Sequence, residues 1–240
     1  MNRVEQIRDS FKTNKIDSFL LTNLTSIKYL TGFMGSAAVA LITKDKNYFV
    51  TDFRYKTVVR NEVNPDFEIS IGKKSSFEFL KSILKKTYEV KWVRVEGLVE
   101  QISAVKTSEE LNCIRKAVDI TDKAFHHILA AIKPGKTTEK ELAADITYFQ
   151  MKLGGEKNSF DPIVASGENS ALPHAHPSDR VIQTGDLLTL DYGTVYKGFN
   201  SDMTRTIAIG EISEEKRKIY EVVLEAQKTA LGNIKAGASC

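Results

Sequence analysis

The sequence predicts an α/β protein with two parts, an α/β region followed by helices around a β-hairpin. In residues 1–104, short β-prone runs alternate with amphipathic segments, which favours a sheet with helices packed on it. From residue 105 onward, two long helical patterns precede two β-prone runs and a further helix. A break in both patterns over residues 97–106 places the boundary between two domains, 1–104 and 105–240, near Ala104.

The composition is typical of a globular protein and excludes two classes of partner. The 240 residues carry 34 basic and 31 acidic side chains, a formal net charge of +3 with no basic stripe, so no nucleic acid partner is expected. No stretch is apolar enough for a transmembrane helix, so no membrane partner is expected. The polar start argues against a secretory signal, and the two cysteines, Cys113 and Cys240, suit a reducing compartment. We therefore expect a cytoplasmic protein.

The first region is expected to alternate helices and strands. Apolar residues three or four apart predict helices, and β-branched or aromatic runs between turn residues predict strands. Val4, Ile7 and Phe11 mark the first helix. Further helices are expected over 53–63 and 77–84, and strands over 16–21, 37–42, 48–50, 67–71 and 92–95.

The second region opens with the longest predicted helix. Thr107 and Glu110 form the pattern of a capping box, which satisfies backbone N–H groups at a helix start. A second helix is expected to begin with a cap at Thr137 or Thr138, and a third begins near Ser213, after the hairpin.

The candidate metal ligands lie in two β-prone runs, 187–195 and 199–209, which are separated by Tyr196-Lys197-Gly198. This turn-like break predicts an antiparallel pair in which Asp191 faces Asp202. Opposed residues on one face have Cβ atoms about 4.5–5.5 Å apart. Two carboxylates this close raise each other's pKa unless a cation lies between them. The hairpin is therefore interpreted as half of a carboxylate metal site.

The alternation of side chains along the two runs supports this interpretation. Thr189 and Asp191 share one face of the first run, and Asp202, Thr204 and Thr206 share one face of the second. The opposite face of the hairpin is apolar and is expected to pack against the core. Taken alone, the acidic pair is also compatible with a solvated strand face, where most carboxylates lie.

Neighbouring motifs resemble the pita-bread metallopeptidases, which include Xaa-Pro aminopeptidases, prolidases and methionine aminopeptidases. The motifs are Phe160-Asp-Pro-Ile-Val-Ala-Ser-Gly, Ala-Leu-Pro-His174, Gly185-Asp186, Leu-Asp191-Tyr-Gly and Ser-Asp202-Met-Thr-Arg-Thr. The spacings match the family as well: 17 positions from His174 to Asp191 (191 − 174) and 11 from Asp191 to Asp202 (202 − 191). Several matches in register are far more specific than one short motif.

The first region narrows the resemblance to Xaa-Pro peptidases, prolidases and creatinases. Tyr29-Leu-Thr-Gly-Phe-Met-Gly-Ser36 and Val50-Thr-Asp52-Phe-Arg54-Tyr55 resemble their amino-terminal domain, and Val105-Lys-Thr-Ser-Glu-Glu110 resembles the start of their catalytic domain. The resemblance implies a creatinase/prolidase-like N-terminal domain over 1–104 and the first half of an α+β pita-bread domain over 105–240. Since that fold has two similar halves, the resemblance also implies helices with an uncovered apolar face.

The resemblance implies a metal-dependent exopeptidase, an Xaa-Pro aminopeptidase or dipeptidase that uses metal-activated water. Asp191 and Asp202 correspond to ligands of two divalent ions, Mn²⁺ in first place with Co²⁺ or Zn²⁺ as alternatives. His174 corresponds to a catalytic histidine that contacts substrate and donates a hydrogen bond to the developing oxyanion. The implied substrate is a small peptide with proline at the second position, and the implied assembly is a homodimer.

The family's site also uses one His and two Glu from later in its catalytic domain, and this chain offers no counterpart before Cys240. His126, His127 and His176 do not stand in the matching position. The alternative is therefore a non-catalytic fragment or remnant that acts, if at all, as a binding or association module. A creatinase-like enzyme without metal is disfavoured because both aspartates are kept.

Overall fold

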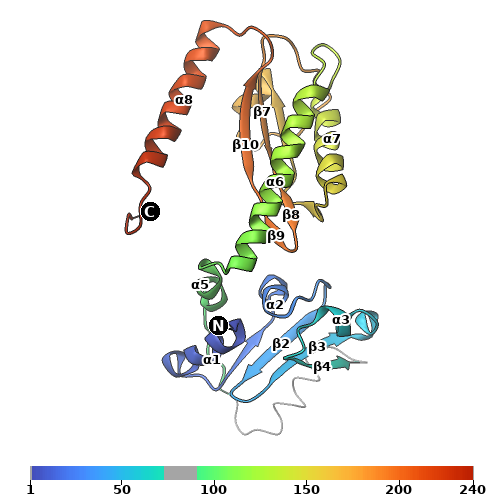
Figure 1. The fold of residues 1–240 in the computed structure, drawn as a ribbon, viewed down its shortest axis with the longest axis vertical. Helices are drawn as coiled ribbons and strands as arrows, with labels where there is room; N and C mark the ends of the chain where they lie inside the picture. Colours follow the sequence, from blue (N-terminus) through green and yellow to red (C-terminus); the bar gives the residue numbers. More distant parts are fainter. Residues whose placement is uncertain (1, 73–90, 240) are drawn as a thin grey trace. The chain divides into compact units, whose positions relative to one another are not determined.

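The chain divides into two compact units. The computed structural model describes residues 2–72 and 91–239 (Figure 1). Met1–Lys106 and Thr107–Cys240 form the units, and each has its own hydrophobic core. The predicted α/β class is confirmed, with a helix-covered sheet in the first unit and helices packed on a hairpin in the second. No helix in either described range is long and apolar enough to cross a membrane.

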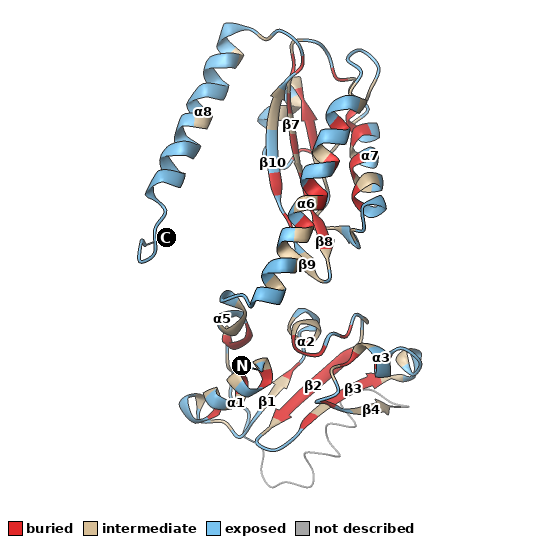
Figure 2. Cartoon of the chain, viewed as in Figure 1, coloured by how far each residue is buried: buried red, intermediate tan, exposed pale blue. Residues whose placement is uncertain are grey.

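The first unit is built on a sheet with strand order β1-β2-β3-β4. Its described elements are α1 (Arg3–Asn14), β1 (Ser18–Leu21), α2 (Leu24–Thr31), β2 (Ala38–Thr43), β3 (Asn47–Asp52), the 3-10 turn η1 (Phe53–Tyr55), α3 (Val59–Glu62), β4 (Glu68–Gly72) and α5 (Leu98–Ala104). The pairs β1–β2 and β2–β3 are antiparallel, and β3–β4 is parallel. Helices α1 and α2 bury Ile7 and Ile27 against one face of the sheet, and α5 packs on α1 and adds Leu98 to the same core (Figure 2).

Three predictions for this unit are wrong in detail. The helix expected over 53–63 is divided into η1 and the single turn α3. Residues 92–95 form no strand, because Trp92 is 65% exposed and no described strand pairs with this segment. The break expected over 97–106 contains α5, since Leu98 and Val99 are buried in the first core. The helix expected over 77–84 lies outside the described residues.

The second unit places two long helices on one face of a hairpin. Its described elements are α6 (Ser108–Ala131), α7 (Glu139–Lys152), β5 (Lys157–Asn158), β6 (Ile163–Ser166), the 3-10 helix η2 (Gly167–Ala171), β7 (Leu187–Tyr192), β8 (Thr194–Tyr196), β9 (Phe199–Asn200), β10 (Met203–Ala208) and α8 (Glu214–Asn233). The described strands form two sheets, with orders β10-β7-β6 and β5-β8-β9. Ile128 of α6 and Leu142 of α7 pack with Leu188 and Leu190 of β7.

Both long helices begin as the sequence predicts. Thr107 accepts a hydrogen bond from the backbone N–H of Glu110, whose side chain in turn accepts one from the backbone of Thr107. Thr138 and Glu141 form the second capping box and make Thr138, not Thr137, the cap of α7. Such caps satisfy N–H groups that the helix itself leaves unpaired.

A two-residue turn joins β8 to β9 and fixes the register of the hairpin. Tyr196 pairs with Phe199, and the intervening Lys197 and Gly198 have φ values of 48° and 81°. Positive φ at both central residues is the geometry of a type I′ turn, whose twist matches that of the strands. With this turn Asp191 lies directly opposite Thr204, not Asp202. The predicted direct pairing of the aspartates is wrong, because it would need a turn centred between Tyr196 and Lys197, whereas the observed turn is centred between Lys197 and Gly198.

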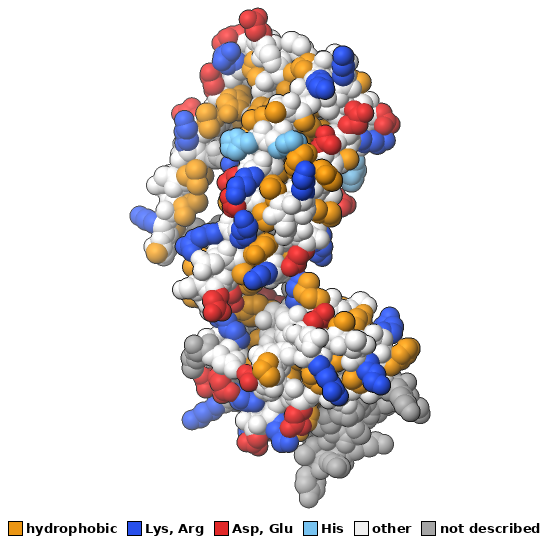
Figure 3. Space-filling view, turned by 45° about the vertical axis from the view of Figure 1, so that its right-hand side comes forward, with side chains coloured by type: hydrophobic (Ala, Val, Ile, Leu, Met, Phe, Trp, Pro, Cys, Tyr) orange, Lys and Arg blue, Asp and Glu red, His pale blue; other side chains and the backbone are white. Residues whose placement is uncertain are grey.

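The last helix keeps its apolar side chains in solvent, as the resemblance implied. No residue of α8 is buried, and Val223 and Leu231 are 64% and 63% exposed (Figure 2). On the face shown in Figure 3, Lys and Arg side chains are interspersed with Asp and Glu, in line with the small net charge. Helix α8 thus exposes several large apolar side chains, among them Ile219, Val222 and Val223.

Replacing Lys197 by Asn is expected to stabilise the protein, because Asn adopts a positive φ at lower cost. We expect the free energy of unfolding in urea to rise by roughly 0.5 kcal/mol. Gly198→Ala should lower it by about 1 kcal/mol, since it forces a Cβ into a left-handed conformation. Lys136→Asn, in a described turn without positive φ, is the matched control and should gain nothing. A Lys197→Asn variant less stable than the wild type would contradict the turn geometry.

Candidate metal centre

Asp191 lies on the polar face of the central strand of its sheet. It is flanked by Thr204 of β10 and Ile163 of β6. Along β7 buried and half-buried residues alternate, so Leu190 enters the core while Asp191 points to the other side. Thr189 Oγ1 lies 3.1 Å from the hydroxyl oxygen of Thr206 on that same side. The predicted division of the hairpin into an apolar and a polar face is therefore confirmed.

Asp202 lies on the same face as Asp191, in a diagonal position. It precedes Thr204 by two residues, and Thr204 is the residue opposite Asp191. Diagonal neighbours across an antiparallel pair are about 7–8 Å apart, closer at Cβ.

The environment of Asp191 disfavours its negative charge. Burial raises the pKa of the Asp191 carboxyl above its usual value, the neighbouring charge of Asp202 raises it further, and a hydrogen bond with Thr204 opposes both. One carboxylate oxygen, Oδ1, is buried without any hydrogen-bond partner. Leaving such a group unpaired costs about 1–3 kcal/mol, and a bound cation removes that cost.

The donor set suits a hard divalent cation. Both groups are carboxylates, and oxygen ligands are preferred by Mg²⁺ and Mn²⁺. Within residues 2–72 and 91–239, no three His, Cys, Asp or Glu side chains gather closely enough to hold a metal ion. The described part of the chain thus brings two carboxylates, those of Asp191 and Asp202, to one face of the hairpin, and the unpartnered oxygen of Asp191 fits a cation at that point.

A close crossing of two backbone segments holds the aspartates in place. Gly193 follows Asp191 by two residues, and a Cβ at this glycine would lie 1.9 Å from the backbone oxygen of Ser201. Ser159 links the two segments by hydrogen bonds. Its N–H donates to Gly193 O at 3.0 Å, and its hydroxyl donates to Ser201 O at 2.8 Å. Only a residue without a side chain at position 193 therefore lets this backbone approach the backbone of Ser201, the residue that precedes Asp202.

The buried hydroxyl of Ser201 ties this crossing to α6. It lies 2.6 Å from the Thr121 hydroxyl and accepts a hydrogen bond from the N–H of Thr194 at 3.0 Å. Sequence reasoning missed both Ser201 and Thr121 as supports of the site. Ser201 stood within a recognised motif, but nothing in the sequence points to Thr121, 80 residues away.

The structure does not bring His174 into contact with the two aspartates. His174 is exposed in the turn that follows η2, and it makes no hydrogen bond or ion pair with any described residue. The connection that carries it leaves β6, the strand paired with β7. His176 is likewise exposed in the same connection.

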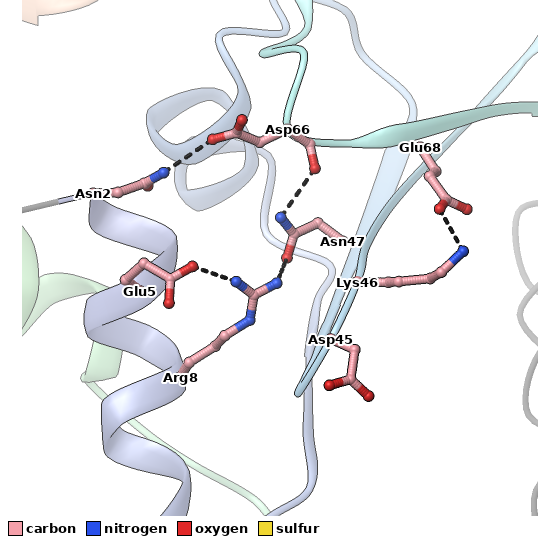
Figure 4. Close-up of a pocket in the computed structure, with 8 residues that line it drawn as sticks. All are labelled: Asn2, Glu5, Arg8, Asp45, Lys46, Asn47, Asp66 and Glu68. Carbon is pink, nitrogen blue, oxygen red and sulfur yellow. Dashed lines mark hydrogen bonds and ion pairs between the residues drawn. The ribbon is translucent and has the colours of Figure 1, made fainter.

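A cavity of about 380 Å³ in the first unit is a structural hydrogen-bond cluster (Figure 4). It is lined by Asn2, Glu5, Arg8, Asp45, Lys46, Asn47, Asp66 and Glu68. Arg8 donates to Thr43 O at 2.9 Å and to the Asn47 side chain at 2.6 Å, and Lys46 pairs with Glu68 at 2.7 Å. These contacts tie α1 to β2 and β3 and tie the turn between those strands to β4, so most of the polar groups are occupied with each other.

Comparison with known proteins gives matches over both units. Residues 112–240 match the model of metallopeptidase family M24, and residues 3–123 match that of the creatinase/prolidase N-terminal domain. The chain is 39% identical to the uncharacterized peptidase YqhT of Bacillus subtilis, over 98% of this chain and 73% of that protein.

Solved structures show the same similarity. An Xaa-Pro dipeptidase from Bacillus anthracis superposes with a TM-score of 0.91 at 38% identity, covering 98% of this chain and 72% of that one. An X-Pro aminopeptidase from Thermotoga maritima gives a TM-score of 0.85 at 33% identity, covering 96% and 73%.

Replacing Asp191 by Asn is expected to stabilise the metal-free protein near neutral pH. Because the pKa of Asp191 is raised, the folded state binds its proton more tightly than the unfolded chain does. Wild-type stability therefore falls as the pH rises through the interval between the unfolded and folded pKa values. In urea denaturation with a chelator, Asp191→Asn should be the more stable protein at pH 7, and the difference should narrow below about pH 4.

Asp119→Asn is the matched control for this experiment. Asp119 is on α6, where hydrogen bonds from Lys123 and Lys116 lower its pKa. Its stabilising contribution is present above the unfolded pKa, so Asp119→Asn should not be more stable than the wild type at pH 7. A metal-free wild type that is more stable than Asp191→Asn at pH 7 would show that the Asp191 carboxylate is satisfied within the protein.

Proposed function

Because the chain belongs to metallopeptidase family M24 and carries a creatinase/prolidase N-terminal domain, we propose that it is a metal-dependent exopeptidase for Xaa-Pro bonds. Two of its relatives of known structure are named as an Xaa-Pro dipeptidase and an X-Pro aminopeptidase, which supports this substrate class. The observation that carries the proposal is the buried oxygen of Asp191, which has no partner and lies beside a second carboxylate.

We assign Asp191 and Asp202 to the metal centre. Two divalent ions are proposed, Mn²⁺ in first place with Co²⁺ or Zn²⁺ as alternatives, because carboxylate oxygens accept each of them. When bound, such ions supply Lewis-acid activation of water and of the scissile carbonyl. The hairpin's own contribution is to hold two charges at a fixed separation on one rigid face.

We assign His174 to substrate binding and catalysis. Its imidazole N–H can donate a hydrogen bond to the carbonyl oxygen on which negative charge develops during attack. The exposure of His174 supports this role, because no described group competes for its ring nitrogens. The proposed substrate is a small peptide with proline at the second position, and a homodimer in the cytoplasm stays a prediction.

One observation favours a second function: the described residues offer few side chains that could bind a metal ion. Among the described residues no three metal-ligating side chains gather, and two carboxylates alone bind a divalent ion weakly. The resemblance implies that one His and two Glu complete the centre in the family. The alternative function is therefore that of a non-catalytic protein that acts in binding or association.

The peptidase proposal predicts that the wild-type chain with Mn²⁺ releases proline from the dipeptide Ala-Pro. Asp202→Asn should lower the rate at least about 100-fold, since metal centres depend this strongly even on supporting groups. His174→Ala should lower kcat by about 100- to 1,000-fold, the usual cost of one oxyanion donor, while Mn²⁺ affinity is retained.

The control for both variants is Asp119→Asn on the outer face of α6, which should cleave at the wild-type rate. A wild-type chain that binds no Mn²⁺ and releases no proline would reject the peptidase proposal and favour the non-catalytic alternative. Cleavage that survives Asp202→Asn unchanged would reject the assignment of the metal centre.

A further inference from the structure

Glu139 is a buried carboxylate that the proposed mechanism does not use. It is the first residue of α7 and is 0% exposed. Its Oε1 accepts hydrogen bonds from the N–H and hydroxyl of Ser166 at 2.7 and 2.8 Å. Its Oε2 accepts from the N–H and hydroxyl of Ser178 at 3.1 and 2.6 Å. The side-chain amide of Asn169 lies 3.1 Å from both oxygens.

These donors stand at the two ends of one loop. Ser166 ends β6 and Asn169 lies in η2, whereas Ser178 follows the segment 172–177. That segment contains His174. A single carboxylate therefore closes the base of the loop that carries the proposed catalytic histidine.

The base of this loop is also tied to the strand that carries Asp191. The Arg180 guanidinium donates to the Ser166 hydroxyl at 2.7 Å and to Asp186 at 2.6 Å. Asp186 is buried and directly precedes β7. In addition, the first N–H groups of α7, at Glu139 and Lys140, donate to carbonyls of Arg180 and Ser178, each at 3.1 Å. The anchor thus connects the loop to the hairpin.

Beyond its base the loop has little to hold it. The N–H of Leu172 donates to Asn169 O at 3.0 Å, and that of Ala175 to Leu172 O at 3.3 Å. Ala175 is buried, while Leu172 and His174 are exposed. With so few contacts of its own, the loop depends on its two ends for the position of His174.

The negative charge of Glu139 favours its role as an anchor for the loop that carries His174. Burial opposes ionisation, but the hydrogen bonds from Ser178, Ser166 and Asn169 outweigh it, so the pKa of Glu139 lies below its usual value. An ionised carboxylate accepts at both oxygens, whereas a glutamine amide would present N–H donors to one of the two serines. The position of Glu139 in the first turn of α7 adds favourable helix-dipole interaction.

We propose that Glu139 is a positioning residue, which fixes His174 relative to Asp191 by anchoring both ends of the intervening loop. This inference rests on the proposed function for the role of His174. The anchoring itself is a property of the fold and can be tested without catalysis.

The test compares hydrogen–deuterium exchange in wild type, Glu139→Gln and Glu141→Gln. Glu141 lies on the same helical turn and serves only the capping box, so it is the matched control. Glu139→Gln should exchange about tenfold faster over residues 167–177, the effect of losing one charged hydrogen bond, while amides of α6 keep their wild-type rates. Glu141→Gln should leave the loop unchanged.

Where Ala-Pro cleavage is measurable, Glu139→Gln should lower kcat with Mn²⁺ affinity retained.

Wild-type exchange over residues 167–177 in Glu139→Gln would overturn the anchoring. Faster exchange over the whole second unit would also overturn it, because Glu139 would then serve general stability. If Glu139→Gln does not fold, Ser178→Ala releases one end of the loop and should speed exchange there alone. Faster exchange of the loop without any loss of kcat would support the anchoring by Glu139 but reject the catalytic role of His174. The two proposals can therefore fail separately.

Discussion

The type I′ turn at Lys197 and Gly198 is the constraint on which the candidate site depends. It sets the register of the whole hairpin, and with it the face on which each side chain lies. A slip of one residue would turn Asp191 toward the core and Leu190 toward solvent. The apolar side of β7, packed under α6 and α7, resists that slip. Packing on one face thus holds two carboxylates together on the other.

Two acidic groups of the second unit, the buried Glu139 and the half-buried Asp191, differ in their hydrogen-bond partners. Glu139 has its full set of donors, and its pKa is lowered. Asp191 has a buried oxygen without a partner, and its pKa is raised. Native proteins rarely leave such a group unsatisfied, and groups with a destabilised charge concentrate at functional sites. The hydrogen bonds of Glu139 therefore stabilise the scaffold, while the unpartnered oxygen of Asp191 supports the proposed cation site.

Features set by neighbours in the sequence were predictable, and features set by distant contacts were not. The capping box at Thr107, a cap at Thr137 or Thr138 and the polar face of Asp191 were predicted from the sequence pattern alone. The diagonal offset of Asp202 depends on which residues form the turn. The role of Glu139 depends on Ser166 and Ser178, which the fold brings together across 27 and 39 residues. In the sequence Glu139 is only one of the polar residues that follow the predicted cap at Thr137 or Thr138, so it gave no separate signal.

We propose above all a common metal centre for Asp191 and Asp202. Its most direct test is a crystal structure of the protein grown with Mn²⁺, with diffraction recorded for the anomalous signal of manganese. We predict anomalous density adjoining the carboxylates of both aspartates, with Asp191 Oδ1 among the ligands. Manganese density elsewhere, with Asp191 Oδ1 still without a partner, would contradict the account.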